Sequence, residues 1–371
     1  MAIKRETVFF ELLRAGLWEH DVRPLPYGEI DFTELLELAE EQSVVGLIAA
    51  GLEHVEDRRI ARQDARSWVG YVLRLEQRNT AMNTFIASLI KKLNSKDICG
   101  LILKGQGVAQ CYERPLWRAS GDVDLFFSDD NYDKAKAVLI PLASSVEKEG
   151  ITQKHLGMKI DQWPVELHGT LHCGLSSRVD RCLDEIKDEV FAKGYFRSWI
   201  NGEAQVSLLP ANEDAVYVFT HILQHFYKGG IGVRQLCDWC RLLWNCKDEI
   251  DLALMERRLK KMGLVSEWKA FGAFAVEYLG MPAEAMPLYS SRMKWKRKAA
   301  SICSFIIEVG NFGHNRDSSY FTKYPYLKRK VISLGRRIGD LYRHARIFPL
   351  DSVRFLPRIV INGLRASMRG E

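Results

Sequence analysis

The chain has 371 residues and a formal net charge of +6, with 47% hydrophobic and 27% charged residues. This composition excludes a disordered or fibrous protein, and a chain of this length usually folds as more than one unit. No apolar run reaches the ~20 residues needed to cross a bilayer, and residues 1–7 lack the apolar core of a secretory signal, so we expect a cytoplasmic protein.

Helical patterns dominate residues 1–94. Apolar residues recur at helical spacing over 7–17, 32–54 and 65–93. Residues 32–39 show the apolar stripe of a helix that packs against neighbouring elements. We therefore expect an N-terminal helical region.

A short apolar run over 98–103 predicts a buried strand, which ends in Lys104-Gly105-Gln106-Gly107. A helix that starts after this turn would direct backbone N–H groups at an anion, and Lys104 would add a positive charge. The alternative is an ordinary tight turn, because the residues match no complete phosphate-binding motif.

Two aspartates flank one apolar residue at the start of a second strand-like segment, Gly121 to Phe127. Alternate side chains of a strand share a face, so Asp122 and Asp124 point to the same side. Two like charges on one face are tolerated when a divalent cation such as Mg²⁺ binds between them and a phosphate-bearing substrate. The pair predicts phosphoryl or nucleotidyl transfer, and the alternative is an acidic pair at a solvated strand end.

A third acidic segment occupies residues 163–169, where Glu166 and His168 share one face of a short extended stretch. Pro164 limits this stretch to a sheet edge or to the start of a strand. Glu166 can lie beside the aspartate pair and complete a three-carboxylate cluster, with Asp161 as the rival third ligand. His168 either binds substrate from this face or is a hydrogen-bonded structural residue.

The remaining elements of this region complete an α/β unit over 95–209. A helix is predicted over 131–145, between the two acidic segments. Residues 195–200 and 204–209 flank Asn201-Gly202-Glu203 and predict a hairpin that closes the unit.

From residue 210 onward the pattern is helical again. His221 and His225 are four residues apart in a helix predicted over 214–227, and Arg234 and Asp238 repeat that spacing. These four residues either form intrahelical pairs or line the cleft opposite the carboxylates.

The eight cysteines have no regular spacing, which favours reduced thiols over a disulfide framework. Cys237, Cys240 and Cys246 allow a zinc or redox interpretation. They lie in a helical context rich in Trp and Leu, and no second Cys-x-x-Cys is present. We expect them to be small buried apolar residues.

The whole basic excess is C-terminal. Residues 323–371 contain twelve Lys/Arg and three Asp/Glu, interleaved with apolar residues. Such a surface could meet nucleic acid, an anionic membrane, or a phosphorylated or sugar-acid acceptor. The alternative is the solvated outer face of terminal helices.

Three segments together resemble the uncharacterised nucleotidyltransferase family within the DNA polymerase beta-like superfamily: Leu103-Lys104-Gly105, Arg118 to Leu125, and Val165 to His168. The resemblance extends from the N-terminal helical region through residues 232–239. It departs from the wider superfamily in the turn, where that superfamily has Gly-Ser and a shorter gap to the acidic pair.

The resemblance implies a role for each matching residue. The metal-binding and catalytic carboxylates, which would hold two Mg²⁺ or Mn²⁺ ions, are Asp122, Asp124 and Glu166. The residues that would bind the triphosphate of an NTP are Lys104, Gly105, Gly107 and Arg118. Strand alternation and helical spacing, rather than the resemblance, lead us to expect five further residues at the substrate: His168, His221, His225, Arg234 and Asp238.

We therefore expect an α+β fold with a small mixed-sheet nucleotidyltransferase core between helical lobes, divided as 1–94, 95–209, 210–322 and the basic segment 323–371. The expected reaction moves an NMP group from an NTP to an acceptor. Relatives of the family are often encoded near bacterial surface-polysaccharide genes, which suggests a sugar-linked acceptor. Two alternatives remain open. One is an inactive binding or scaffold protein with the same fold, and the other is a toxin-like enzyme that modifies tRNA or protein.

Overall fold

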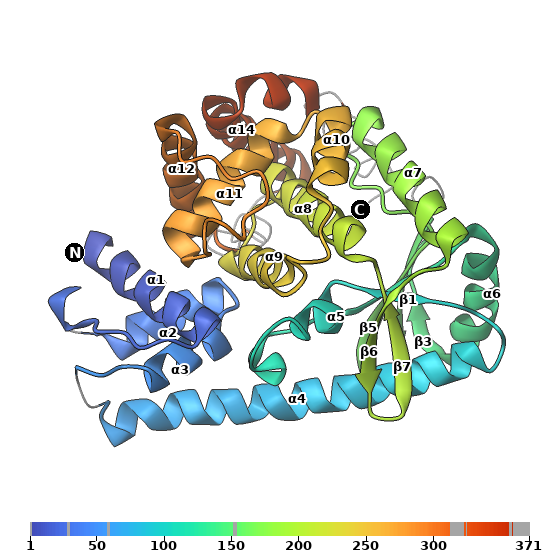
Figure 1. Ribbon diagram of the computed structural model, residues 1–371, viewed down its shortest axis with the longest axis horizontal. Helices are drawn as coiled ribbons and strands as arrows, with labels where there is room; N and C mark the ends of the chain where they lie inside the picture. The colour runs from blue at the N-terminus through green and yellow to red at the C-terminus, as the bar shows by residue number, and fades with distance from the viewer. Residues whose placement is uncertain are drawn as a thin grey trace.

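The computed structural model describes residues 2–27, 30–57, 60–150, 154–311, 323, 325–355 and 358. As predicted, the fold is α+β, with a seven-stranded mixed sheet between helices that precede and follow it in the chain (Figure 1). Within the described ranges, no helix is both long enough and apolar enough to span a membrane.

The N-terminal region contains the helices α1 (Ala2–Trp18), α2 (Phe32–Glu41), α3 (Val45–Glu53) and α4 (Arg62–Asn94). The single helix predicted over 32–54 is wrong, because the chain breaks at Ser43, whose φ is 57°. A positive φ cannot continue a right-handed helix. The Asp31 side chain caps α2 by accepting hydrogen bonds from the N–H groups of Thr33 and Glu34.

The helix α4 connects two hydrophobic cores. It runs beneath both the N-terminal helices and the sheet (Figure 1). Trp68 and Val72, in its first half, pack in the core of the helical regions. Its second half, from Met82 to Leu93, packs in the core beneath the sheet. One long amphipathic helix therefore fixes the sheet relative to the N-terminal helices.

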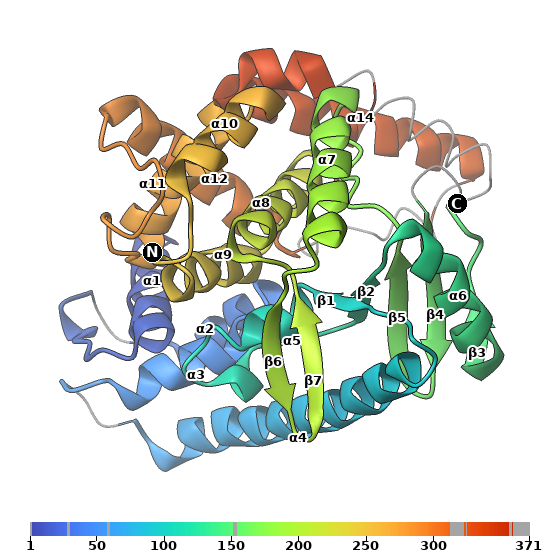
Figure 2. The same ribbon diagram turned by 45° about the vertical axis from the view of Figure 1, so that its right-hand side comes forward.

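The sheet has the strand order β3-β4-β5-β2-β1-β7-β6 (Figure 2). Its strands are β1 (Leu101–Leu103), β2 (Val123–Phe126), β3 (Ala143–Val146), β4 (His155–Ile160), β5 (Trp163–His168), β6 (Arg197–Asn201) and β7 (Ala204–Leu208). The pairs β2–β5 and β1–β7 are parallel and the other pairs are antiparallel. The predicted hairpin is present as β6 and β7.

One prediction for this region needs correction, and one choice that the sequence left open is decided. The helix predicted over 131–145 ends earlier, as α6 (Asp129–Leu139), and is followed by the short 3₁₀ helix Ile140–Leu142 and by β3. Pro141 has no N–H to continue an α-helix. The segment with Glu166 is β5, which lies between β4 and β2, so of the two positions that Pro164 allows, a sheet edge or the start of a strand, the second is present. Pro164 is tolerated there because it is at the start of the strand, before pairing with β2 begins at Val165.

The two faces of the sheet have different environments. Val123 and Leu125 of β2 pack in the core formed with α4 and α6. The alternate residues, Asp124 and Phe126, face the other side, where Phe126 joins the core of the helical regions. Polar side chains on this second face therefore lie beneath the C-terminal helices.

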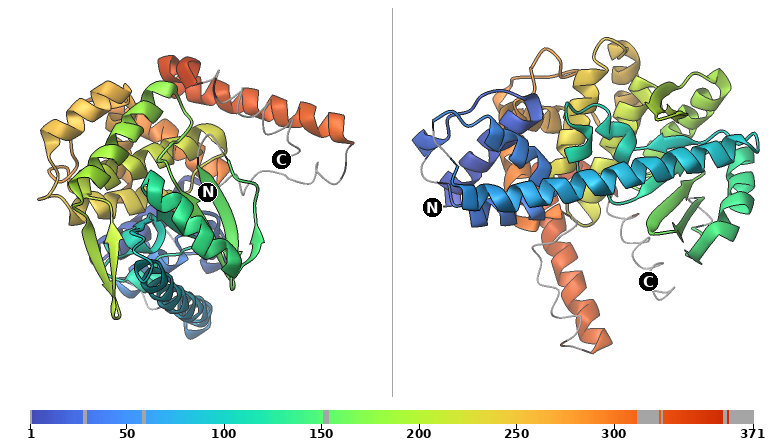
Figure 3. Two further views of the ribbon diagram at one scale, coloured as in Figure 1. Left: turned by 90° about the vertical axis from the view of Figure 1, so that its right-hand side faces the viewer. Right: turned by 90° about the horizontal axis from the view of Figure 1, so that it is seen from below.

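The C-terminal region is helical, as predicted. Its helices among the described residues are α8 (Ala211–Lys228), α9 (Val233–Asn245), α10 (Leu252–Met262), α11 (Val265–Leu279), α12 (Met293–Val309) and α14 (Tyr326–Ile347), whereas α7 (Ser177–Lys193) precedes β6 in the α/β unit. Figure 3 shows that α14 extends away from the body of the protein. Phe348 and Phe355, which follow it, are fully buried and anchor the chain.

Several arginines of the basic C-terminal segment have partners within the protein. Arg343 lies 2.7 Å from Glu308, Arg358 lies 2.7 Å from Asp180, and Arg354 donates to the carbonyl oxygen of Met262. These contacts favour a structural role for part of the segment. Residues 359–371 lie outside the described residues, so an anionic partner for the segment as a whole stays a prediction.

The contact between α1 and α3 provides a test of the fold. A Cβ atom on Gly16 would lie 1.8 Å from the carbonyl oxygen of Leu47, whereas one on Gly70 of α4 would have Arg74 as its nearest neighbour, at 3.6 Å. We expect Gly16→Ala to lower the free energy of unfolding by about 1–3 kcal/mol or more, since backbone atoms must move. Gly70→Ala should raise it by up to about 1 kcal/mol through helix propensity. Urea denaturation measures both, and equal effects would contradict the backbone contact.

Candidate active site

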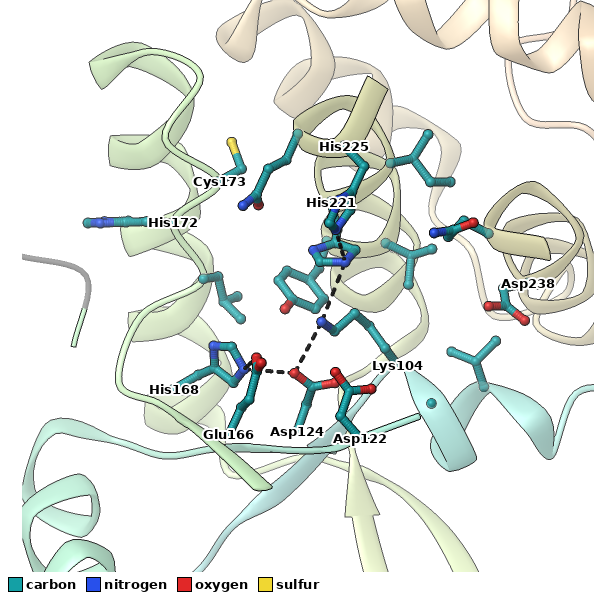
Figure 4. A pocket seen from close by; sticks show the side chains of 18 of the residues that line it. Lys104, Asp122, Asp124, Glu166, His168, His172, Cys173, His221, His225 and Asp238 are labelled. Atoms are coloured by element: carbon teal, nitrogen blue, oxygen red, sulfur yellow. Dashed lines mark hydrogen bonds and ion pairs between the residues drawn. The ribbon is translucent and has the colours of Figure 1, made fainter. Parts of the chain in front are cut away.

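The register of two parallel strands brings the predicted carboxylates together. Asp124 of β2 is directly beside Glu166 of β5, and Asp122 immediately precedes β2. One oxygen from each of these three carboxylates lies within 4.8 Å of the others (Figure 4). Asp161 is instead exposed in the turn between β4 and β5. The side chain that the structure places beside the aspartate pair is therefore Glu166.

Lys104 is the first residue after β1, whose Leu103 pairs with Asp124. Its Nζ atom lies 3.1 Å from Oδ1 of Asp124. Lys104 has a φ of 49° and Gly105 a φ of 44°, and together they start the short helix α5 (Gly105–Ala109). Gly105 lines the cavity described below. Gly107 instead faces the sheet, where a Cβ atom would lie 2.9 Å from Leu208.

A buried polar network holds the turn in place. Gln106 donates to Oδ1 of Asn79 in α4, and the Asn79 amide donates to the carbonyl oxygens of Leu116 and Arg118. The network connects α4 to the start of α5 and to the segment around the 3₁₀ helix Pro115–Trp117. Its sequence signal is a single asparagine on the buried face of a helix, which the sequence analysis did not single out.

The charges of the cluster are unevenly compensated. Burial opposes ionisation of Asp124, but Lys104 and the hydrogen bond from His168 outweigh it and lower the pKa of this carboxyl. The negative charge of Asp124, together with burial, raises the pKa of Asp122. Burial would lower the pKa of Lys104, but Asp124 outweighs it and raises that pKa well above its usual range. Asp122 is thus the carboxylate whose charge is least compensated.

Two histidines approach Glu166 and Asp124 from the same face. His168 Nε2 lies 2.8 Å from Oδ1 of Asp124, and His155 Nε2 lies 3.0 Å from Oε2 of Glu166. Hydrogen bonds from His155 and then His168 lower the pKa of Glu166. His155 was not predicted as a site residue, because the strand β4 is not recognisable from the sequence alone. The signal is the hairpin turn at Asp161, which places residues 155 and 168 opposite each other.

These side chains open into a cavity of about 400 Å³ between the sheet and α8 and α9. The opposite wall includes the four residues predicted there, His221, His225, Arg234 and Asp238. It also includes Tyr217, which was not predicted. Arg234 also lies 3.7 Å from Asp238 on the same helix. Arg234 and Asp238 therefore form an intrahelical pair and also line the cavity.

The two histidines of α8 lie next to Lys104. His221 Nε2 is 3.5 Å from Lys104 Nζ and 2.9 Å from His225 Nε2. Burial and the charge of Lys104 lower the pKa of His221 well below its usual value and that of His225 to about 4. Both rings are consequently neutral near pH 7.

Asp238 is the centre of a buried ion pair. Arg118 donates from Nε and from its second terminal nitrogen to the two oxygens of Asp238, and the Tyr112 hydroxyl also donates to Asp238. The Arg118 and Asp238 side chains are only 3% and 8% exposed. The remaining Arg118 nitrogen donates to Ser120. Although Arg118 lines the cavity, its donors are thus directed at protein groups.

Arg234 is less completely paired. One terminal nitrogen donates to the carbonyl oxygen of Ala119, whereas its buried Nε atom has no hydrogen-bond partner among the described residues. Burial, together with the nearby Arg118, lowers the pKa of Arg234. This guanidinium lines the cavity and has fewer protein partners than that of Arg118.

All eight cysteines are free. Cys237, Cys240 and Cys246 are buried in the hydrophobic core of the helical regions, which confirms the expectation of small apolar residues. Burial raises the pKa of the Cys240 thiol above its usual range. The hydrogen bond with Cys111 instead lowers the pKa of Cys246.

A family model described as uncharacterised nucleotidyltransferase matches residues 28–280. The chain belongs to this family. The matched range includes every residue of the cavity described above. No curated protein and no solved structure matches the chain. Membership supports a nucleotide-transferring activity in general, and the acidic cluster could hold a metal ion.

The ion pair in the cavity wall can be tested by stability measurements. Asp238→Ala would leave Arg118 and Arg234 buried without their counter-ion, so we expect the free energy of unfolding to fall by about 3–5 kcal/mol. Glu308→Ala removes an exposed pair with Arg343 and should cost less than about 1 kcal/mol. Urea denaturation of both variants gives the comparison. A small loss for Asp238→Ala would show that the buried pair is not needed for folding.

Proposed function

We propose that this protein is a metal-dependent nucleotidyltransferase that moves an NMP group from an NTP to an acceptor. The observation that carries the proposal is the convergence of Asp122, Asp124 and Glu166 within 4.8 Å, in a chain of a nucleotidyltransferase family. The finer assignment to the DNA polymerase beta-like superfamily is part of the proposal.

The donor set fits a hard divalent cation. Three carboxylates provide the oxygen ligands that Mg²⁺ and Mn²⁺ prefer. The raised pKa of Asp122 reports repulsion from Asp124 that Lys104 only partly offsets. Asp122, Asp124 and Glu166 would hold the metal, which when bound supplies positive charge for the acceptor oxygen and the leaving pyrophosphate.

Two cations of the chain would bind the phosphates. Lys104 lies at the mouth of the turn, between the carboxylates and His221. Arg234 lines the opposite side of the cavity, and its partners among the described residues are the carbonyl oxygen of Ala119 and Asp238. We propose Arg234, rather than Arg118, as the guanidinium that contacts phosphate, because Asp238 and Ser120 already occupy the Arg118 donors. The chain's contribution is then to position the phosphates and to neutralise their charge.

The part of the acceptor that is distant from its reacting hydroxyl would lie near the neutral histidines. His221 and His225 provide uncharged hydrogen-bonding groups in a part of the cavity away from the carboxylates (Figure 4). Such groups suit hydroxyl-bearing acceptors. We propose a sugar-linked acceptor, because the resemblance to this family implies an association with surface-polysaccharide genes. The acceptor hydroxyl would attack the α-phosphate, the bond between the α- and β-phosphates would break, and pyrophosphate would leave.

The decisive experiment is a screen of the purified protein with each of the four NTPs and Mg²⁺ or Mn²⁺, with pyrophosphate release as the readout. We expect release with at least one NTP, and faster release when the correct acceptor is added. Binding of metal and NTP without release in the presence of candidate acceptors would favour the inactive binding protein. Release that depends on added tRNA or protein would favour the toxin-like alternative.

Substitution of the aspartate pair tests the metal site. Asp122→Asn and Asp124→Asn each remove one negative charge at nearly constant shape, so we expect turnover to fall by at least about 100-fold. Asp122→Asn should also raise the melting temperature slightly, because it relieves repulsion from Asp124. Pyrophosphate release and thermal unfolding check both effects. Turnover at the wild-type rate in the double variant would exclude this mechanism.

Substitution of Arg234 separates phosphate binding from stability. A charged hydrogen bond is worth about 1.5–3 kcal/mol, so Arg234→Gln should raise the KM for the NTP at least about tenfold. The fold should survive, because Asp238 keeps Arg118. Arg181→Gln, on an exposed position of α7, is the matched control and should leave the KM unchanged. An unchanged KM in Arg234→Gln would remove this residue from the phosphate site.

A further inference from the structure

A second set of potential metal ligands adjoins the three carboxylates. His155, Glu166 and His168 each provide one ligand atom, and these atoms lie within 4.8 Å of one another. Oε2 of Glu166 is 3.0 Å from Nε2 of His155 and 3.5 Å from Nε2 of His168. Glu166 therefore belongs to both sets, and the histidines were not part of the carboxylate cluster that the sequence analysis predicted.

The strand register produces this arrangement. His155 of β4 and His168 of β5 are directly opposite each other, and Glu166 is two residues before His168, so all three share one face. Gly157 is the residue opposite Glu166. No side chain of β4 therefore lies between the Glu166 carboxylate and His155. The two imidazole rings are 4.9 Å apart, measured between their centres.

The distances suit a coordination shell. Zinc–nitrogen and zinc–oxygen bonds of about 2.0–2.2 Å place neighbouring ligand atoms about 3.0–3.5 Å apart in octahedral or tetrahedral geometry. The two distances from Glu166 Oε2, 3.0 and 3.5 Å, fall in this range. All three residues line the cavity, so an ion can reach them from solvent.

The chemistry of this set differs from that of the carboxylates. Three carboxylate oxygens suit Mg²⁺ and Mn²⁺, whereas imidazole nitrogens favour Zn²⁺, Co²⁺ and other first-row transition metals. The surrounding charge favours cation binding, because Asp122 and Asp124 add negative charge to that of Glu166. The nearby cation Lys104 offsets only part of this charge.

We propose that His155, Glu166 and His168 form a second metal site, which binds a first-row transition-metal dication such as Zn²⁺ or Co²⁺ and shares Glu166 with the carboxylate cluster. The inference rests on the proposed function only through that shared carboxylate. Metal binding by the histidines requires no nucleotide and no turnover.

The test uses the full-length protein, stripped of metal with a chelator and then titrated with Zn²⁺ in excess Mg²⁺, which keeps the carboxylate cluster occupied. Calorimetry should show one Zn²⁺ per chain. We expect at least about tenfold weaker binding in His155→Gln, which retains a donor for Glu166 but removes the imidazole ligand. His168→Gln is a second variant with the same expectation, and urea denaturation confirms that each is folded.

The matched control is His172→Gln. His172 lines the same cavity and lies 2.7 Å from Asp184, but it belongs to neither ligand set. Its substitution should leave Zn²⁺ affinity unchanged. Titration with Co²⁺ should produce visible absorption bands whose position or intensity changes in His155→Gln and His168→Gln and not in His172→Gln.

The outcomes separate this proposal from the proposed function. No Zn²⁺ binding in the presence of Mg²⁺, or equal affinity in wild type and His155→Gln, would overturn the second site even if pyrophosphate release is observed. Zn²⁺ binding that is lost in both His155→Gln and His168→Gln would support the site even if no NTP is turned over.

Discussion

The repulsion among three carboxylates at one end of the sheet is the constraint on which the cavity depends. Two unit charges about 4 Å apart repel by about 4 kcal/mol at an effective dielectric constant of about 20. Asp124 is only 2% exposed, so water does little to screen it. Lys104 and His168 contact Asp124, and His155 and Glu166 share a hydrogen bond. Asp122 is left as the carboxylate that a bound cation would stabilise most.

The compensation requires a strained backbone at Lys104. Its φ of 49° and ψ of −146° lie in a region that glycine favours, and such a conformation costs of order 1–3 kcal/mol. The strain persists because the surroundings fix the residue on both sides. The ammonium group is paired with Asp124, and the following turn is held by the hydrogen bond between Gln106 and Asn79. The long helix α4, which supplies Asn79, thereby supports the site as well as the fold.

Period-two alternation was enough to predict that Asp122 and Asp124 share a face and that Glu166 and His168 share another. It could not decide that the two faces coincide, because this depends on which strands pair and in what register. It also could not reveal His155, since β4 contains a glycine and a lysine and is recognisable only once its hairpin with β5 is known. Helical regions were predicted more completely, because their periodicity is local, although the break at residue 43 was missed.

The cavity holds histidines in two opposite electrostatic environments. Burial disfavours the charged form of His168, yet its hydrogen bonds to Asp124 and Glu166 raise its pKa. Burial and the charge of Lys104 instead lower the pKa of His221. Lys104 lies between the two rings and lowers the pKa of both, so the contrast comes from the carboxylates of Asp124 and Glu166, which hydrogen-bond to His168. The cavity therefore has a charged side, where the carboxylates and Lys104 lie, and an uncharged side, which His221 and His225 line.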